Sequence, residues 1–340
     1  MTDRRLGIAA CAIGVLALLE GTGARAQELF RGKTISIVVG FSAGGTYDQQ
    51  GRLFARHMGQ FLPGVPNIVV QNMPGAGSII AATNLYNIAP KDGTVIAIIG
   101  GGTVAEPLLG NPQAKYDARK FNWIGGRTPD NFLCLIDSGT GVRTIDDLRK
   151  RETVVGSTGP GSRTQNYPRA LNEMLGTKFK IVSGYPGGNE ISMALERHEV
   201  EGYCGWSMDS MRSRAPNLLP EGKVRAVAQF VIGRTNALPD IPLASDLPST
   251  DIGRQAMDFI AADSILAWPL VAPPGLAPDV IAAHRKAFDA VTKYQPFLDD
   301  ARKQTLEVNP VSGADLQSFV DRLYSASPEV IALVKKITGN

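Results

Sequence analysis

Short apolar, β-branched runs alternate with amphipathic segments along most of this chain. Apolar residues recur at helical spacing in residues 49–61, 79–88, 167–175 and 190–197. The runs between and around them have strand character: residues 35–39, 67–71, 95–99, 132–136, 153–156, 179–183, 200–204, 225–231 and 264–271. This alternation predicts an α/β fold in which mostly parallel sheets are flanked by helices.

Two segments rich in glycine or proline interrupt the periodicity, at residues 125–130 and 238–243. A chain of 340 residues is long for one hydrophobic core and suits two. If both segments cross between domains, residues 131–238 form an inserted domain 2. Residues 28–130 and 239–340 then form a discontinuous domain 1. The cleft between two such domains is a common ligand site.

The N-terminus has the pattern of an export signal, which we assign to residues 1–26. Arg4 and Arg5 precede an apolar run over residues 6–19, and Ala24-Arg25-Ala26 is a small-x-small cleavage site. The apolar run is short for a membrane span. We therefore expect cleavage after Ala26 and a periplasmic location.

Charge and motif content exclude several classes of function. The net charge of +3 is close to neutral and the basic residues are dispersed, which argues against a nucleic-acid partner. The sequence contains neither C-x-x-C nor H-E-x-x-H, so we expect no metal site and no cofactor.

Two cysteines, Cys134 and Cys204, remain after the expected cleavage, and both lie in strand-like runs. In an oxidising compartment they can form a disulfide. The alternative is a pair of separate buried thiols, and the sequence leaves both possibilities open.

Four glycine-rich turns follow predicted strands and precede helices, at residues 41–46, 72–78, 156–164 and 184–190. Glycine allows the backbone to approach a ligand closely, and a helix N-terminus favours an anion. None of the turns matches the dinucleotide fingerprint or the P-loop. Two turns fall in each expected domain, which predicts an anion site between the domains.

Residues 40–44 also match G-x-S-x-G, the nucleophile elbow of serine hydrolases, with Ser42 at its centre. A secreted serine hydrolase is therefore an alternative function. The motif ends the first strand of the mature chain, so no earlier strand supplies an oxyanion loop. His57 and His284 lie in helical stretches and His198 at a helix end, which argues against a catalytic triad.

An ordered set of motifs covers essentially the whole mature chain: ISIVVGFSAGGTYD at 35–48, NMPGAGS at 72–78, APKDGT at 89–94, GSTGPG at 156–161, PDIPL at 239–243 and PPGLAP at 273–278. The set resembles the solute receptors of the tripartite tricarboxylate transporter family, also called Bug proteins. Each motif is weak by itself, and the order makes the resemblance specific.

The resemblance implies a periplasmic-binding-protein-like, two-domain clamshell (Venus flytrap) that performs no chemistry. It implies a transport function, in which a small carboxylated solute is captured and delivered to membrane permease subunits. A sensory receptor that docks on a signalling protein is a further alternative. We expect a monomer, and the identity of the ligand stays open.

The resemblance also implies which loops hold the ligand, largely through backbone amides and bridging waters. The first loop contributes Ser42, Ala43, Gly44, Gly45 and Thr46, with Asp48 bracing it. The second contributes Pro74, Gly75, Ala76, Gly77 and Ser78, and the third Ser157, Thr158, Gly159, Gly161, Ser162, Arg163 and Thr164. Members of this family usually have a proline pair where this chain has Ser42-Ala43, so the resemblance implies the fold and leaves the identity of the ligand open.

Three side chains are candidate ligand contacts on their own chemistry. Arg163 can clamp a carboxylate with its planar fork, or it can be a solvated residue on the first turn of a helix. Tyr185 and Trp206 can wall the pocket, or they can pack in the core at strand ends.

Overall fold

The computed structural model describes residues 28–127, 130–232 and 238–339, so the expected export signal lies outside the described residues. The strands are β1 Thr34–Val39, β2 Asn67–Asn72, β3 Val95–Ile98, β4 Asn122–Arg127, β5 Phe132–Asp137, β6 Thr153–Ser157, β7 Phe179–Ser183, β8 Gly202–Ser207, β9 Val224–Phe230, β10 Ala267–Ala272 and β11 Pro310–Ser312. The helices are α2 Thr46–His57, α3 Ile79–Asn87, α4 Glu106–Leu109, α5 Ile145–Lys150, α6 Arg163–Leu175, α7 Gly188–Glu196, α8 Met208–Arg214, α9 Asp251–Ala261, α10 Pro278–Val291, α11 Gln295–Lys303, α12 Gly313–Tyr324 and α13 Pro328–Thr338.

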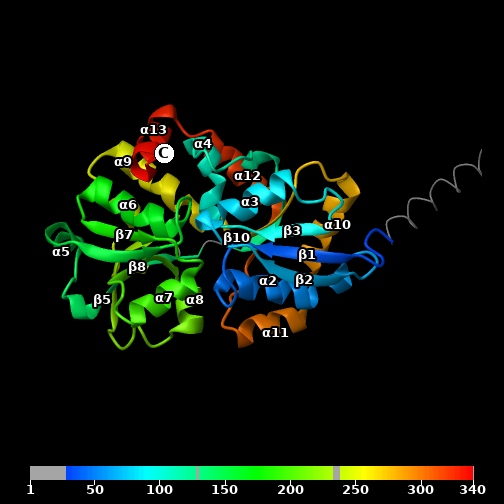
Figure 1. Ribbon diagram of the computed structural model, residues 1–340, viewed down its shortest axis with the longest axis horizontal. Helices are drawn as coiled ribbons and strands as arrows, with labels where there is room; N and C mark the ends of the chain where they lie inside the picture. Colours follow the sequence, from blue (N-terminus) through cyan, green and yellow to red (C-terminus); the bar gives the residue numbers. More distant parts are fainter. Residues whose placement is uncertain (1–27, 128–129, 233–237, 340) are drawn as a thin grey trace, which may run out of the picture.

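The strands form two separate sheets, which lie side by side in Figure 1. The first has the order β11-β4-β10-β3-β1-β2 and the second β7-β6-β8-β5-β9. Strands β1, β2 and β3 pair in parallel, as do β6, β7 and β8. The remaining strands join antiparallel. The α/β class with a mostly parallel centre in each sheet is thus confirmed, and both sheets are mixed.

Helices cover both faces of each sheet, because inner strands such as β8 and β10 bury side chains on both sides. In Figure 1, α3 and α12 lie on one face of the first sheet and α2 and α11 on the other. In the second sheet, α6 contacts β7 and β8, and α7 packs against β6 and β8. Buried residues such as Ile35, Ile37 and Val39 in β1 carry this packing.

The first sheet contains two strands that the periodicity did not predict, β4 and β11. Gly125 and Gly126, which we interpreted as part of a crossover, lie inside β4. A Cβ at Gly125 would lie 2.3 Å from the Phe288 ring of α10, so the glycine lets that ring close on the strand. The expected domain bounds stay a proposal, since α9 and α13 contact α6 of the second sheet.

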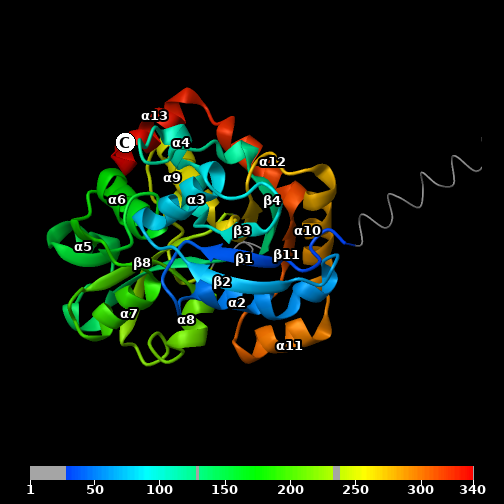
Figure 2. The same cartoon turned by 45° about the vertical axis from the view of Figure 1, so that its right-hand side comes forward.

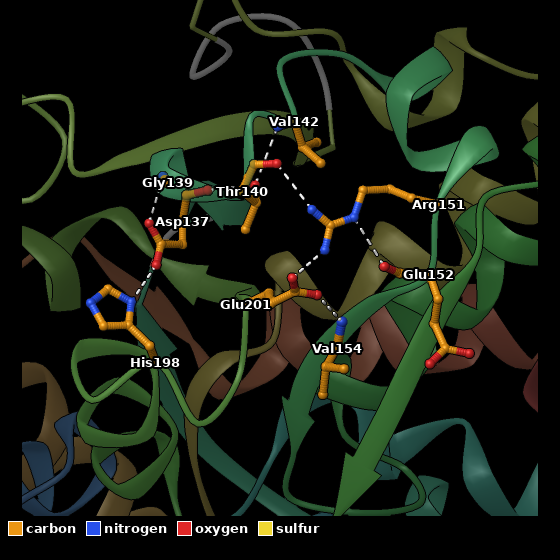
Figure 3. A network of polar contacts seen from close by, with 9 residues as sticks. All are labelled: Asp137, Gly139, Thr140, Val142, Arg151, Glu152, Val154, His198 and Glu201. Carbon is orange, nitrogen blue, oxygen red and sulfur yellow. Dashed lines mark hydrogen bonds and ion pairs between the residues drawn. The ribbon is translucent and has the colours of Figure 1, made fainter.

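A polar network connects the ends of three inner strands of the second sheet (Figure 3). Arg151 donates to the carboxylate of Glu201 and, at 3.0 Å, to the Thr140 carbonyl. Glu201 accepts from the Val154 N–H at 2.9 Å, and His198 contacts Asp137 at 2.6 Å. At this end of the sheet β6 and β8 begin and β5 ends. The loops with the glycine-rich turns lie at the other end.

Among the described residues, no helix is long and apolar enough to cross a membrane.

Candidate functional site

A cavity lies where loops at the carboxyl ends of the parallel strands of both sheets meet, as is usual in α/β proteins. It has a volume of about 70 Å³. Its lining comprises Phe41, Ser42, Gly45, Thr46, Tyr47, Gly77, Gly100, Gly101, Gly102, Phe132, Thr158, Gly161, Ser162, Arg163, Thr164, Gly187, Gly188, Tyr203, Gly205, Trp206, Ser207, Ser210, Arg214 and Trp268.

The loop from β1 to α2 is held in shape by Asp48. This carboxylate accepts hydrogen bonds from the Gly44 N–H at 2.9 Å, Arg52 Nε at 2.8 Å and Asn72 Nδ2 at 3.0 Å. Burial would raise the pKa of Asp48, and these hydrogen bonds outweigh it and lower the pKa. Asp48 is therefore ionised and braces the loop from behind, without lining the cavity.

The loop from β6 to α6 is held by its own hydroxyl groups. Thr164 Oγ1 accepts from the Thr158 N–H at 3.0 Å, and Ser162 Oγ donates to the Gly159 carbonyl at 2.7 Å. Ser157 Oγ accepts from the Gly159 N–H at 3.0 Å. These bonds fix the backbone at the start of α6, so the loop is ordered before any ligand arrives.

Arg163, the first residue of α6, lines the cavity and is 8% exposed. Its Nε donates to Asp263 Oδ2 at 3.0 Å, and its guanidinium lies 3.6 Å from the centre of the Phe132 ring. Burial would lower the pKa of Arg163, but the Asp263 carboxylate raises it well above its usual value. Nη2 is buried and has no hydrogen-bond partner in the part of the chain described. Arg163 is thus charged, and its Nη2 hydrogens are unpaired among the described residues.

A second group of buried charges lies next to the cavity. Arg127 Nη2 donates to Asp209 at 2.5 Å, and Ser207 donates to Asp130. Burial and the nearby Asp209 carboxylate raise the pKa of Asp130 to about 7. Near neutral pH the carboxyl group of Asp130 is therefore partly protonated.

Direct contacts hold the two sheets' loops together around the cavity. Ser42 Oγ donates to Glu190 at 2.9 Å, and Thr46 Oγ1 donates to Ser210 Oγ at 2.5 Å. The Gly77 N–H donates to the Thr158 carbonyl at 3.1 Å. The structure is therefore a closed clamshell.

Closure depends on glycines that bring backbone against backbone. A Cβ at Gly102, which follows β3, would lie 2.4 Å from the Gly161 carbonyl oxygen of the opposite loop. At Gly45 the nearest atom, the Ser42 carbonyl oxygen, would be 3.7 Å away. Gly102→Ala is thus sterically blocked in the closed form and Gly45→Ala is not.

We expect Gly102→Ala to shift the protein towards an open form, since overpacking costs about 1–3 kcal/mol. That is roughly a 5- to 150-fold change in the closed-to-open ratio. Small-angle X-ray scattering would detect a larger radius of gyration, with Gly45→Ala as the matched control. Equal radii for both variants and the parent would contradict this account of closure.

The structure brings ten of the residues expected from sequence to the cavity wall: Ser42, Gly45, Thr46, Gly77, Thr158, Gly161, Ser162, Arg163, Thr164 and Trp206. The others lie in the same loops or behind them without lining it: Ala43, Gly44, Asp48, Pro74, Gly75, Ala76, Ser78, Ser157, Gly159 and Tyr185. For both sets of residues, direct contact with the ligand stays a prediction.

Sequence reasoning missed most of the aromatic wall and a fifth glycine-rich turn. Gly100-Gly101-Gly102 follows β3 directly, and this strand–glycine signal was present in the sequence. Phe41 and Tyr47 lie within a turn that we did identify. Phe132 and Trp268 come from β5 and β10, and no local pattern places those strands beside the cavity.

Two sheets that close over a cavity at their strand ends define a solute-binding protein of the periplasmic binding class. The model of the tripartite tricarboxylate transporter family receptor (TctC) matches residues 52–335. The chain belongs to this family.

Similar proteins agree with that assignment. A UPF0065 protein in the gbd 5′ region of Cupriavidus necator is 25% identical over 320 residues, which are 89% of this chain and 88% of that protein. The periplasmic binding protein BugD has a TM-score of 0.69 at 22% identity, covering 89% of this chain and 97% of its own. MatC from Rhodopseudomonas palustris, solved with bound malate, has a TM-score of 0.67 at 20% identity and covers 90% and 98%.

Proposed function

We propose that the protein is an extracytoplasmic receptor that captures a small organic carboxylate and delivers it to the permease subunits of a tripartite tricarboxylate transporter. The observation that carries this proposal is Arg163, a buried and charged arginine with an unpartnered Nη2 at the wall of a closed cavity. A carboxylate is the natural partner for such a donor. Export by a signal peptide cleaved after Ala26 belongs to the same proposal.

The solved relatives support a carboxylate ligand. MatC was solved with malate, and Rpa4515 of R. palustris, at a TM-score of 0.67 and 19% identity, with adipate. Both ligands are small organic acids. Membership of the receptor family supports delivery to a transporter.

The surroundings of Ser42 favour a receptor over a hydrolase. Its hydroxyl donates to a carboxylate, Glu190, and no histidine is among the described residues that line the cavity. His57 contacts Asp300 at 2.9 Å, and His284 contacts the Gly93 carbonyl at 2.9 Å. His198 contacts Asp137 at the end of the second sheet that lies away from the cavity. Without a histidine as base, a serine hydroxyl is a weak nucleophile.

A thermal-shift screen over aliphatic, aromatic and amino-acid carboxylates tests this function. A ligand at 100 times its Kd should add about 2.7 kcal/mol to the free energy of unfolding. A serine-directed fluorophosphonate probe should leave Ser42 unlabelled, with Ser42→Ala as the control. Stoichiometric labelling of Ser42, or the absence of any stabilising carboxylate, would overturn the proposal.

A further inference from the structure

Six aromatic rings line the cavity: Phe41, Tyr47, Phe132, Tyr203, Trp206 and Trp268. Four of them form a continuous row, with centroid distances of 4.2 Å for Phe41–Tyr47, 5.9 Å for Tyr47–Trp268 and 6.2 Å for Trp268–Phe132. This row runs from the β1–α2 loop across β10 to β5, and so joins the two sheets.

The other two rings come from β8 of the second sheet. Tyr203 and Trp206 stack with their centroids 4.9 Å apart and their planes at 17°. Trp206 Nε1 donates to Ser210 Oγ at 3.3 Å, so the indole has its polar edge satisfied. The cavity is thus lined by two groups of rings from different elements. A flat ring can use such walls for stacked or edge-to-face contacts, which a flexible aliphatic chain cannot make.

The charges of the lining limit how many carboxylates the cavity can accept. Arg163 and Arg214 are its charged residues, and no carboxylate is among the lining residues that the structure describes. The charge of Arg163 is already offset by Asp263, at 3.0 Å. Arg214 is half-buried and forms no ion pair with any described residue.

At most one uncompensated positive charge is therefore available, because the Glu190 carboxylate lies directly behind Ser42 of the lining. A single carboxylate would balance this charge. A second carboxylate would be enclosed without a countercharge, and burying an unpaired ion is costly.

We propose that the ligand is an aromatic monocarboxylate, with its ring between the aromatic walls and its carboxylate near Arg214 and Arg163. This inference rests on the proposed receptor function and narrows its ligand class. It separates this chain from the relatives solved with malate and adipate, which are dicarboxylates.

Calorimetric titration of the parent protein with four acids tests the inference. The probes are benzoate, cyclohexanecarboxylate as its non-aromatic match in size and charge, adipate and malate. We expect benzoate to bind at least about tenfold more tightly than cyclohexanecarboxylate, because ring–ring contacts add affinity beyond buried area. We expect adipate and malate to bind at least about tenfold more weakly than benzoate.

Two variants assign the effect to its residues. Trp206→Leu should reduce the preference for benzoate over cyclohexanecarboxylate, whereas Tyr86→Leu should retain it, because Tyr86 contacts Tyr116 and Phe121 outside the cavity. Arg214→Gln should weaken benzoate binding about tenfold or more.

The outcomes distinguish failure of the aromatic monocarboxylate as ligand from failure of the proposed carboxylate receptor. Tight binding of adipate or malate without binding of benzoate overturns the aromatic monocarboxylate and leaves the carboxylate receptor standing. Equal affinity for benzoate and cyclohexanecarboxylate overturns the role of the rings. If none of the four acids binds and the wider carboxylate screen is also empty, both proposals fail.

Discussion

Arg163→Ala is expected to lower the free energy of unfolding by about 3–5 kcal/mol, because it leaves the buried Asp263 without its countercharge. The side chains of this pair are 8% and 7% exposed, so water cannot replace the lost partner. Urea denaturation of the variant and the parent gives the comparison. A loss below about 1 kcal/mol would mean that the pair is better solvated than its burial indicates.

Arg163→Met combined with Asp263→Asn removes both charges, and it should restore most of that stability. Tyr167 can still donate its hydroxyl hydrogen to an asparagine carbonyl in place of Asp263. This double variant separates folding from binding.

We expect the double variant to bind the screened ligand about ten- to a hundredfold more weakly, since a hydrogen bond to a charged group contributes about 1.5–3 kcal/mol. Asp48→Asn should weaken binding less, because Asp48 braces its loop without lining the cavity and the asparagine carbonyl can still accept from the Gly44 N–H. If the double variant binds like the parent, Arg163 is a structural residue and the ligand is held by other donors.

The structure links Cys134 and Cys204 by a disulfide, which is one of the two arrangements that the sequence left open. Its reduction is expected to cost roughly 4 kcal/mol of unfolding free energy, from the chain-entropy relation for a link across 70 residues. The two cysteines face each other in the antiparallel pair of β5 and β8, and both are fully buried. Urea denaturation with and without dithiothreitol measures the effect. Cys134→Ala combined with Cys204→Ala is the control, since the reductant should not change its stability.

Thiol titration of the denatured, unreduced mature protein gives an independent test of the same bond. We expect no free thiol. Two free thiols per chain would show that the cysteines are buried without being linked.

Local pattern was enough to predict the parts of the site that lie close together in sequence. The strand over residues 35–39, its glycine-rich turn and Asp48 form one continuous segment, and the structure has them as β1, a loop and α2. The same holds for residues 156–164, where a strand end, a glycine turn and Arg163 follow one another. In both segments the glycine-rich turn and the side chain that acts beside it, Asp48 or Arg163, lie within about fifteen residues of the strand.

Contacts between distant segments could not be predicted in this way. Gly125 and Gly126 favour a turn by their local chemistry, yet they lie in β4 because Phe288 and Leu316 pack against them. Trp268 is a residue of a strand-like run, and only the antiparallel pairing of β10 with β3 and β4 brings it to the cavity. Arg163 was a plausible ligand clamp from sequence, but its pairing with Asp263, 100 residues away, was not visible.

The C-terminal segment links the two halves of the clamshell a further time. The chain crosses between the halves from β4 to β5 and crosses back from β9 to β10. It then continues through α12, which packs on β4, to α13, which packs on α6 and α9 (Figure 2). Arg169 of α6 donates to the Thr338 carbonyl, and Lys336 pairs with Glu173. Two bodies joined at one point can rotate about any axis, and each added crossing removes rotational freedom. The contacts of α13 therefore restrict the directions in which the two halves can move apart.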